Sequence, residues 1–150
     1  MGECIGKSRG GLTSKIHTVT DGNGNAMHFI VTDGSVHDCT QARELLEPVI
    51  HADSLVLGDR AFNTDKIINY IASKSAVAVI PSKKNRKVCR DYDRSVYKNR
   101  NQIERFFNRL KQFRRIATRY DKLEASFLAL VQLAAALIAI LNFESIRKSL

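Results

Sequence analysis

The sequence is poor in the residues that mark disulfide-bonded and zinc-binding proteins. It holds three cysteines, Cys4, Cys39 and Cys89, which lie far apart and form no CxxC pair. The four histidines are scattered as well, so no ligand spacing typical of a zinc site occurs. We therefore expect free thiols in a reducing compartment, which points to a cytoplasmic protein.

Long apolar runs are also scarce. The first eleven residues, MGECIGKSRGG, contain no apolar core of a signal peptide. The one extended run, residues 127–141, is apolar except for Gln132 and is shorter than the roughly 20 residues that a membrane span requires. We expect a buried terminal helix over 123–148, and a membrane-associated basic protein is the weaker interpretation.

Acidic residues are scarce in one part of the chain. Residues 82–120 hold fourteen Lys or Arg and three acids, a charge of +11, so the remaining residues sum to −2 within the net +9. Such a concentrated basic segment indicates a polyanionic partner, nucleic acid before membrane, although a solubilising surface is the alternative. The segment 82–90 carries five of these cations and no aromatic residue, which favours phosphate contacts over base stacking.

The order of the remaining patterns predicts a single α/β (α+β) domain over 1–150 with a mixed sheet covered by helices. Residues 2–11 are Gly-rich and read as irregular, and 12–32 read as a β-hairpin around the turn 21–25. The other expected elements are helices at 39–50, 64–73, 93–118 and 123–148, and strands at 54–59 and 76–80. Asn63 or Thr64 and Asp93 or Ser95 are the candidate helix caps.

Asp59 follows SLVLG, a continuous apolar run typical of a strand buried on both faces. Ligands of α/β sheets collect beyond the strand ends, so Asp59 stands where a catalytic carboxylate would lie. A turn-forming or capping Asp is the alternative. The pair His37 and Asp38 also invites a catalytic interpretation, but capping and local hydrogen bonding explain it more simply.

Residues 97–111, YKNRNQIERFFNRLK, have the periodicity of a helix with three faces. The apolar face holds Ile103, Phe106, Phe107, Leu110 and Phe113, and Glu104 lies on a polar line beside it. Glu104 is the only acid between Lys98 and Tyr120, among eight Lys or Arg. One interpretation is an ion pair with Arg100; the other is that Glu104 holds a metal ion while the cations bind nucleic-acid phosphates.

The spacing of Tyr97, Arg100, Glu104 and Lys111 resembles the signature of bacterial insertion-sequence transposases of the DDE type. The segments SRGGLTSKIHTVTDGNGN, LGDRAFNTD, AVIPSKKNRK and IERFFNRLKQFRRIATRYDKL resemble successive blocks of the same family, over nearly the whole chain. The resemblance implies an RNase H-like mixed sheet flanked by helices and two-metal phosphoryl transfer with Mg²⁺ or Mn²⁺. It also implies transposon-end and target DNA as partners, a homodimer, and a nucleoid-associated location.

By this resemblance, Asp59 is the second catalytic Asp and Glu104 the terminal Glu, and both bind metal. Tyr97, Arg100 and Lys111 would orient DNA near the scissile phosphate and neutralise charge. The expected DNA-binding residues are Lys83, Lys84, Arg86, Lys87, Arg105, Arg109, Arg114 and Arg115.

The first Asp of the family would precede the hairpin at 12–32, and nothing before Leu12 fits it, while Asp21 lies in a turn and Asp33 ends a strand. We therefore expect a C-terminal portion that lacks the first strand and the first Asp and is inactive alone. It is either the downstream frame of a frameshifted element or a decayed remnant. The alternative function is a non-catalytic DNA-binding protein, or an inhibitor that pairs with the full-length transposase.

Overall fold

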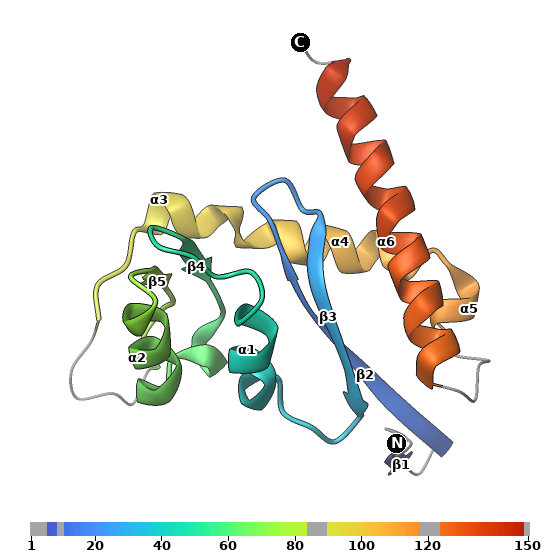
Figure 1. Ribbon diagram of the computed structural model, residues 1–150, viewed down its shortest axis with the longest axis horizontal. Coiled ribbons are helices and arrows are strands. Elements are labelled where there is room, and N and C mark those ends of the chain that lie inside the picture. Colours follow the sequence, from blue (N-terminus) through green and yellow to red (C-terminus); the bar gives the residue numbers. More distant parts are fainter. Residues whose placement is uncertain (1–5, 9–10, 84–89, 118–123, 149–150) are drawn as a thin grey trace. The chain divides into compact units, whose positions relative to one another are not determined.

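The computed structural model describes residues 6–8, 11–83, 90–117 and 124–148. They belong to two compact units (Figure 1). The first comprises Met1–Val36 and Gln102–Leu150, and the second His37–Asn101. Helices and small sheets alternate in an α+β arrangement, as predicted, and this is consistent with an RNase H-like core. The described strands form one antiparallel sheet and one parallel pair.

The first unit contains the predicted hairpin, made of β2 (Gly11–Thr20) and β3 (Ala26–Asp33). Its turn is built on the Asp21 carboxylate, which accepts hydrogen bonds from the backbone N of Asn23 (2.9 Å) and Asn25 (2.8 Å). Gly24 has φ +82°, a conformation that favours glycine. The Asp-Gly-Asn-Gly sequence thus specifies the turn locally.

A short strand, β1 (Gly6–Ser8), pairs antiparallel with the start of β2. Residues 2–11 were predicted to be irregular, so this part of the prediction is wrong. The segment lacks the alternation of apolar and polar residues that predicts a strand. β1 is defined instead by its backbone pairing with Gly11–Thr13.

Three helices complete the first unit: α4 (Asn101–Leu110), α5 (Arg114–Ala117) and α6 (Glu124–Arg147). Their apolar side chains and those of β3 form one core, in which Phe106 and Val131 are at most 1% exposed. Of the apolar face predicted for the helix that carries Glu104, Phe106 and Leu110 are buried, and Ile103, Phe107 and Phe113 are partly buried. The core consists of Val31, Phe106, Leu110, Ile116, Phe127, Val131, Ala134, Ala135 and Ile138.

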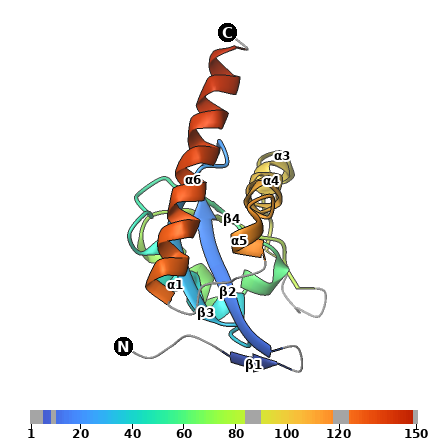
Figure 2. The same cartoon turned by 90° about the vertical axis from the view of Figure 1, so that its right-hand side faces the viewer.

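Helix α6 runs along the hairpin, and its C-terminal part extends past the hairpin turn (Figures 1 and 2). It was predicted to be buried, but only one face is. Residues spaced three and four apart from Phe127 to Ile138 pack in the core, whereas Leu133 (61% exposed) and Phe143 (70%) lie on the open side. By length and composition alone, Ala125–Arg147 would suffice to cross a membrane; its packed face is that of a core helix.

The second unit is built around a parallel pair, β4 (Leu55–Leu57) and β5 (Val77–Val79), in register Leu55↔Val77. The chain reaches β5 through η1 (Arg60–Phe62) and α2 (Asp65–Ser73). Thr64 caps α2 by accepting from the backbone N of Ile67 at 3.3 Å, as predicted, and Ile67 and Ile71 face inward. The pair was predicted to be buried on both faces, yet Leu55 and Val77 are each 53% exposed, because the described elements of this unit leave that point of the pair uncovered.

The first helix of this unit, α1 (Asp38–Leu46), ends earlier than predicted. His37 occupies its N-cap position without a side-chain hydrogen bond to the helix. His37 and Asp38 are both exposed and line neither pocket described below. Neither residue therefore gains support for a catalytic role from its surroundings.

The helix predicted over 93–118 is divided. Helical residues run through α3 (Arg94–Tyr97), η2 (Lys98–Arg100) and α4, and Asp93 caps the start by accepting from the backbone N of Ser95 (2.7 Å) and Val96 (3.1 Å). After Leu110 the backbone tightens, since Gln112 and Phe113 donate to residues three positions back. Phe113, in the resulting turn, packs against the core, and Ile116 of α5 is part of it.

Candidate active site

Asp59 follows β4 directly and is the N-cap residue of η1. Its Oδ1 accepts a hydrogen bond from the backbone N of Ala61 at 2.7 Å, and the residue is exposed. The capping interpretation of Asp59 is therefore correct. It does not compete with a functional one, because a carboxylate has a second oxygen and several acceptor positions.

Asp59 opens onto a pocket of about 390 Å³ in the second unit. Two residues of the predicted signature, Tyr97 and Arg100, line the same pocket. The fold thus brings together a strand-end carboxylate and two side chains from a helical segment far away in the sequence. The complete lining is Asp59, Arg60, Ala61, Pro81, Tyr92, Tyr97 and Arg100.

Aromatic contacts stabilise the side of this pocket that is formed by Tyr92, Tyr97 and Arg100. The rings of Tyr92 and Tyr97 meet edge to face, with centroids 5.2 Å apart and an interplanar angle of 73°. The guanidinium carbon of Arg100 lies 5.8 Å from the centroid of the Tyr97 ring, within the range of a cation–π contact. Two arginines and one carboxylate give the pocket a net positive lining, which suits a phosphate group.

Glu104 lies in the first turn of α4, in the first unit, and is exposed. Lys111 follows the last residue of α4 and is also exposed. The metal-binding role of Glu104 and the DNA-orienting role of Lys111 stay predictions.

Within the described ranges, no group of three or more His, Cys, Asp or Glu residues lies close enough together to hold a metal ion. A hard divalent cation such as Mg²⁺ takes carboxylate oxygens, and Asp59 and Glu104 have the right chemistry for that. Their shared role in holding a metal ion stays a prediction.

The cations predicted to bind DNA are distributed over both units. Arg105 and Arg109 on α4 line a second pocket, of about 250 Å³, that lies between the hairpin turn, α4 and α6; Arg109 also donates to Asn142 Oδ1. Lys83, Arg114 and Arg115 are exposed. Lys84, Arg86 and Lys87 lie outside the described residues.

Arg90, which the sequence groups with the basic segment, has a different role. Its guanidinium bonds to Asn63 Oδ1 at 3.1 Å and to Asp65 Oδ1 at 2.6 Å, so it is used within the second unit. Sequence reasoning also missed Arg60 and Tyr92 as lining residues. The adjacency of Arg60 to Asp59 was a usable signal, whereas nothing in the sequence marks Tyr92.

Comparison with known proteins agrees with the signature. A family model described as the transposase DDE domain matches residues 2–139. The chain is 38% identical over 128 residues to a protein of Brucella ovis named as a transposase for insertion sequence element IS6501, covering 85% of this chain and 98% of that protein. No solved structure matches the chain. On the family match and on this identity, the chain belongs to the DDE transposases of bacterial insertion sequences.

Proposed function

We propose that this chain forms the C-terminal part of a DDE transposase that cuts and joins DNA at insertion-sequence ends. In this proposal Asp59 and Glu104 are two of the three catalytic carboxylates. The observation that carries it is the pocket that Asp59 shares with Tyr97 and Arg100. Family membership alone would not require these three side chains to line one pocket.

The chemistry follows from the charges of these side chains. Strand cleavage and joining place negative charge on the oxygens around the scissile phosphorus, and fixed cations stabilise that charge. Arg100 and Arg60 supply such cations beside Asp59. Divalent ions, Mg²⁺ or Mn²⁺, would activate the attacking oxygen and stabilise the leaving one when held by the carboxylates.

The third carboxylate comes, in this proposal, from residues outside these 150, and the chain alone is inactive. Several strand edges have no partner among the described strands. Strands β3, β4 and β5 each pair with one neighbour, and β2 beyond Thr13 pairs with β3 alone. In this proposal a strand that ends in the first Asp pairs with one of these edges.

The partners proposed are the DNA of transposon ends and target, and a second transposase subunit, either an identical copy or the full-length enzyme. The net charge of +9 supports DNA binding and a place at the nucleoid in the cytoplasm. The cations of the pocket and of α4 would contact phosphates, and Lys111 would act near the scissile group.

A cross-linking experiment tests the shared role of Asp59 and Glu104. Two metals about 4 Å apart, each about 2 Å from its ligand oxygens, require carboxyl groups within about 8 Å. In a chain whose native cysteines are replaced by serine, Asp59→Cys with Glu104→Cys should be joined by a bifunctional thiol reagent of that span. Asp59→Cys with Arg105→Cys is the matched control, since neighbouring helix positions point about 100° apart. Equal yields from both pairs, or none from the first, would contradict the proposal.

The basic charge also supports a second candidate, a non-catalytic DNA-binding protein or inhibitor of the intact transposase. The two candidates differ in what Glu104→Gln does. In a joined protein that contains the first Asp, the substitution abolishes cleavage under the first proposal. Under the second there is no cleavage to lose, and DNA affinity is unchanged or slightly higher because a negative charge is removed.

A further inference from the structure

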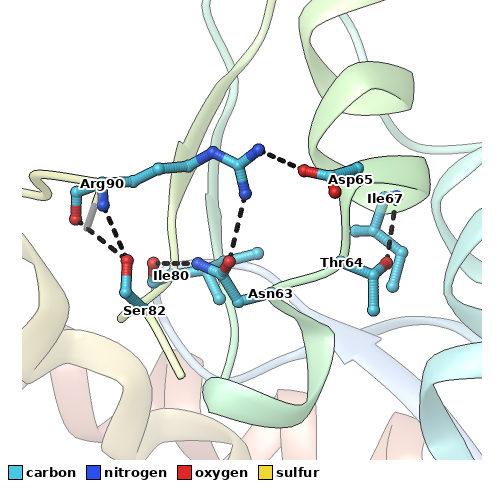
Figure 3. Close-up of polar contacts among 7 residues, drawn as sticks. All are labelled: Asn63, Thr64, Asp65, Ile67, Ile80, Ser82 and Arg90. Atoms are coloured by element: carbon cyan, nitrogen blue, oxygen red, sulfur yellow. Dashed lines mark hydrogen bonds and ion pairs between the residues drawn. The ribbon is translucent and has the colours of Figure 1, made fainter. Parts of the chain in front are cut away.

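A network of polar contacts is centred on one buried side chain of the second unit (Figure 3). Its centre is Asn63, which follows η1 and is 2% exposed. The Asn63 side-chain Nδ2 donates to the carbonyl oxygen of Ile80 at 3.0 Å, and its Oδ1 accepts from Arg90 Nη1 at 3.1 Å. The amide therefore links the segment after β4 to the segment after β5 and to Arg90.

Arg90 extends the network in two further directions. Its Nη2 lies 2.6 Å from Asp65 Oδ1, at the start of α2. Its backbone N donates to Ser82 Oγ at 2.7 Å, which holds Ser82 and Arg90 together although eight positions separate them. A guanidinium can reach Asn63 and Asp65 at once because its donors form a rigid fork.

The network adjoins part of the pocket lining. Three of the segments that it joins lead within two positions to a residue that lines the pocket, whereas the start of α2 at Asp65 does not. The pairs are Asn63 with Ala61, Ile80 with Pro81, and Arg90 with Tyr92. The hydrogen bonds of Asn63 and Arg90 therefore connect these three parts of the lining to one another.

We propose that Asn63 and Arg90 are positioning residues of the candidate active site. They set the spacing between the Asp59 segment and the Tyr92–Tyr97 side without contacting DNA themselves. This inference rests on the proposed function of the pocket. It removes Arg90 from the phosphate-binding cations and gives it a role that its charge alone cannot fulfil, since Lys would keep the charge but not the fork.

The test uses the full chain with fluorotyrosine at its four tyrosines and reads their ¹⁹F resonances. Arg90→Lys and Asn63→Ala should each shift or broaden the resonances of Tyr92 and Tyr97. The Tyr70 resonance should not shift, because Tyr70 lies on α2 outside the pocket. The centroid of its ring is 5.3 Å from Arg43 Cζ and 5.7 Å from Lys74 Nζ. Lys83→Gln, a cation change on an exposed side chain next to Ser82, is the matched control and should move none of the three.

Unchanged Tyr92 and Tyr97 resonances in Arg90→Lys would overturn the proposal. If Asn63→Ala fails to fold, all tyrosine resonances lose their dispersion. The proposal is then tested with Arg90→Lys and Asp65→Asn, each of which should shift or broaden the Tyr92 and Tyr97 resonances. Asp65→Asn breaks the charged contact and leaves Asn63 intact.

DNA affinity gives a second readout. A positioning role predicts that Arg90→Lys weakens binding roughly threefold or more with an unchanged salt dependence, and that Asn63→Ala and Arg90→Lys combine non-additively. Lys83→Gln should instead reduce the slope of log affinity against log salt by about 0.9, as one lost phosphate contact does. Full affinity in Arg90→Lys would contradict positioning. If the wild-type chain binds no DNA, the proposed function fails, and the tyrosine resonances still test the network.

Discussion

The two roles of Asp59 can be separated by a pair of substitutions. Asp59→Asn keeps a side-chain oxygen for the backbone N of Ala61, the 2.7 Å contact that caps η1, and removes the charge. Asp59→Ala removes both. Loss of an N-cap typically costs about 1 kcal/mol (roughly 0.5–2) of the free energy of unfolding. Asp59→Asn should therefore lie within about 0.5 kcal/mol of wild type, and Asp59→Ala about 1 kcal/mol below it.

Urea unfolding followed by far-UV circular dichroism measures these differences, since the chain has no Trp to serve as a fluorescence probe. Strand cleavage, in contrast, should not distinguish the two variants. In a protein joined to a segment that supplies the proposed first Asp, both substitutions should reduce cleavage by more than the roughly 10- to 100-fold that loss of an outer partner of a metal site costs. A stable Asp59→Asn variant that still cleaves DNA would refute the catalytic reasoning and leave capping as the whole role of Asp59.

Other predictions concern the core, the pH dependence and the charge. Phe106→Ala, at a side chain 1% exposed, should lower the free energy of unfolding by about 3–5 kcal/mol, whereas Leu133→Ala, 61% exposed on α6, should change it by less than about 1 kcal/mol; equal losses in urea unfolding would argue against the described packing. The hydrogen bonds from Ser95 and Val96 lower the pKa of the Asp93 carboxyl, so its contribution to stability is present above the ordinary value of 3.8 and is lost as pH falls through the lowered value. Asp93→Asn should flatten that acid limb of the stability–pH curve, and an unchanged limb would contradict the assignment. Arg105→Gln should weaken DNA binding at low salt and reduce the salt slope by about 0.9 if Arg105 contacts a phosphate; filter binding at several salt concentrations would show an unchanged slope if it does not.

Local signals explain why much of the fold could be predicted from the sequence. The Asp21–Asn25 turn specifies its own hydrogen bonds, and Thr64 and Asp93 are capping residues at the starts of periodic segments. The periodicity of the helix that carries Glu104 identified an apolar face whose residues are all at least partly buried, with Phe106 and Leu110 fully so. These features depend on neighbours within about four positions, which is the range that a sequence pattern records.

Features that depend on distant partners escaped prediction. The strand β1 exists through its pairing with β2 and has no apolar pattern of its own. The turn after Leu110 interrupts a segment whose apolar periodicity continues to Phe113, so the pattern gave no sign of it. Arg90 looked like one more cation of a basic segment because its partners, Asn63 and Asp65, lie more than twenty positions away.

The residues of the candidate site likewise fall into those that the sequence identified and those that only the structure revealed. Asp59 and the spacing of Tyr97 and Arg100 were identified from the sequence, and the structure adds that the three line one pocket. Tyr92 and Arg60 were recognised as lining residues only from the structure of that pocket. A pocket lining is set by tertiary packing, so spacing along the chain could not supply it.

The proposal that Asp59 and Glu104 serve one phosphoryl-transfer centre is tested most directly by strand cleavage of DNA that carries the element's own ends. The protein to use is this chain joined to a segment that supplies the proposed first Asp, in Mg²⁺ or Mn²⁺. We expect cleavage by the joined protein, loss of cleavage in both Asp59→Asn and Glu104→Gln, and DNA affinity near wild type in both variants. Cleavage that persists in either variant, with the protein folded and DNA bound, would contradict it.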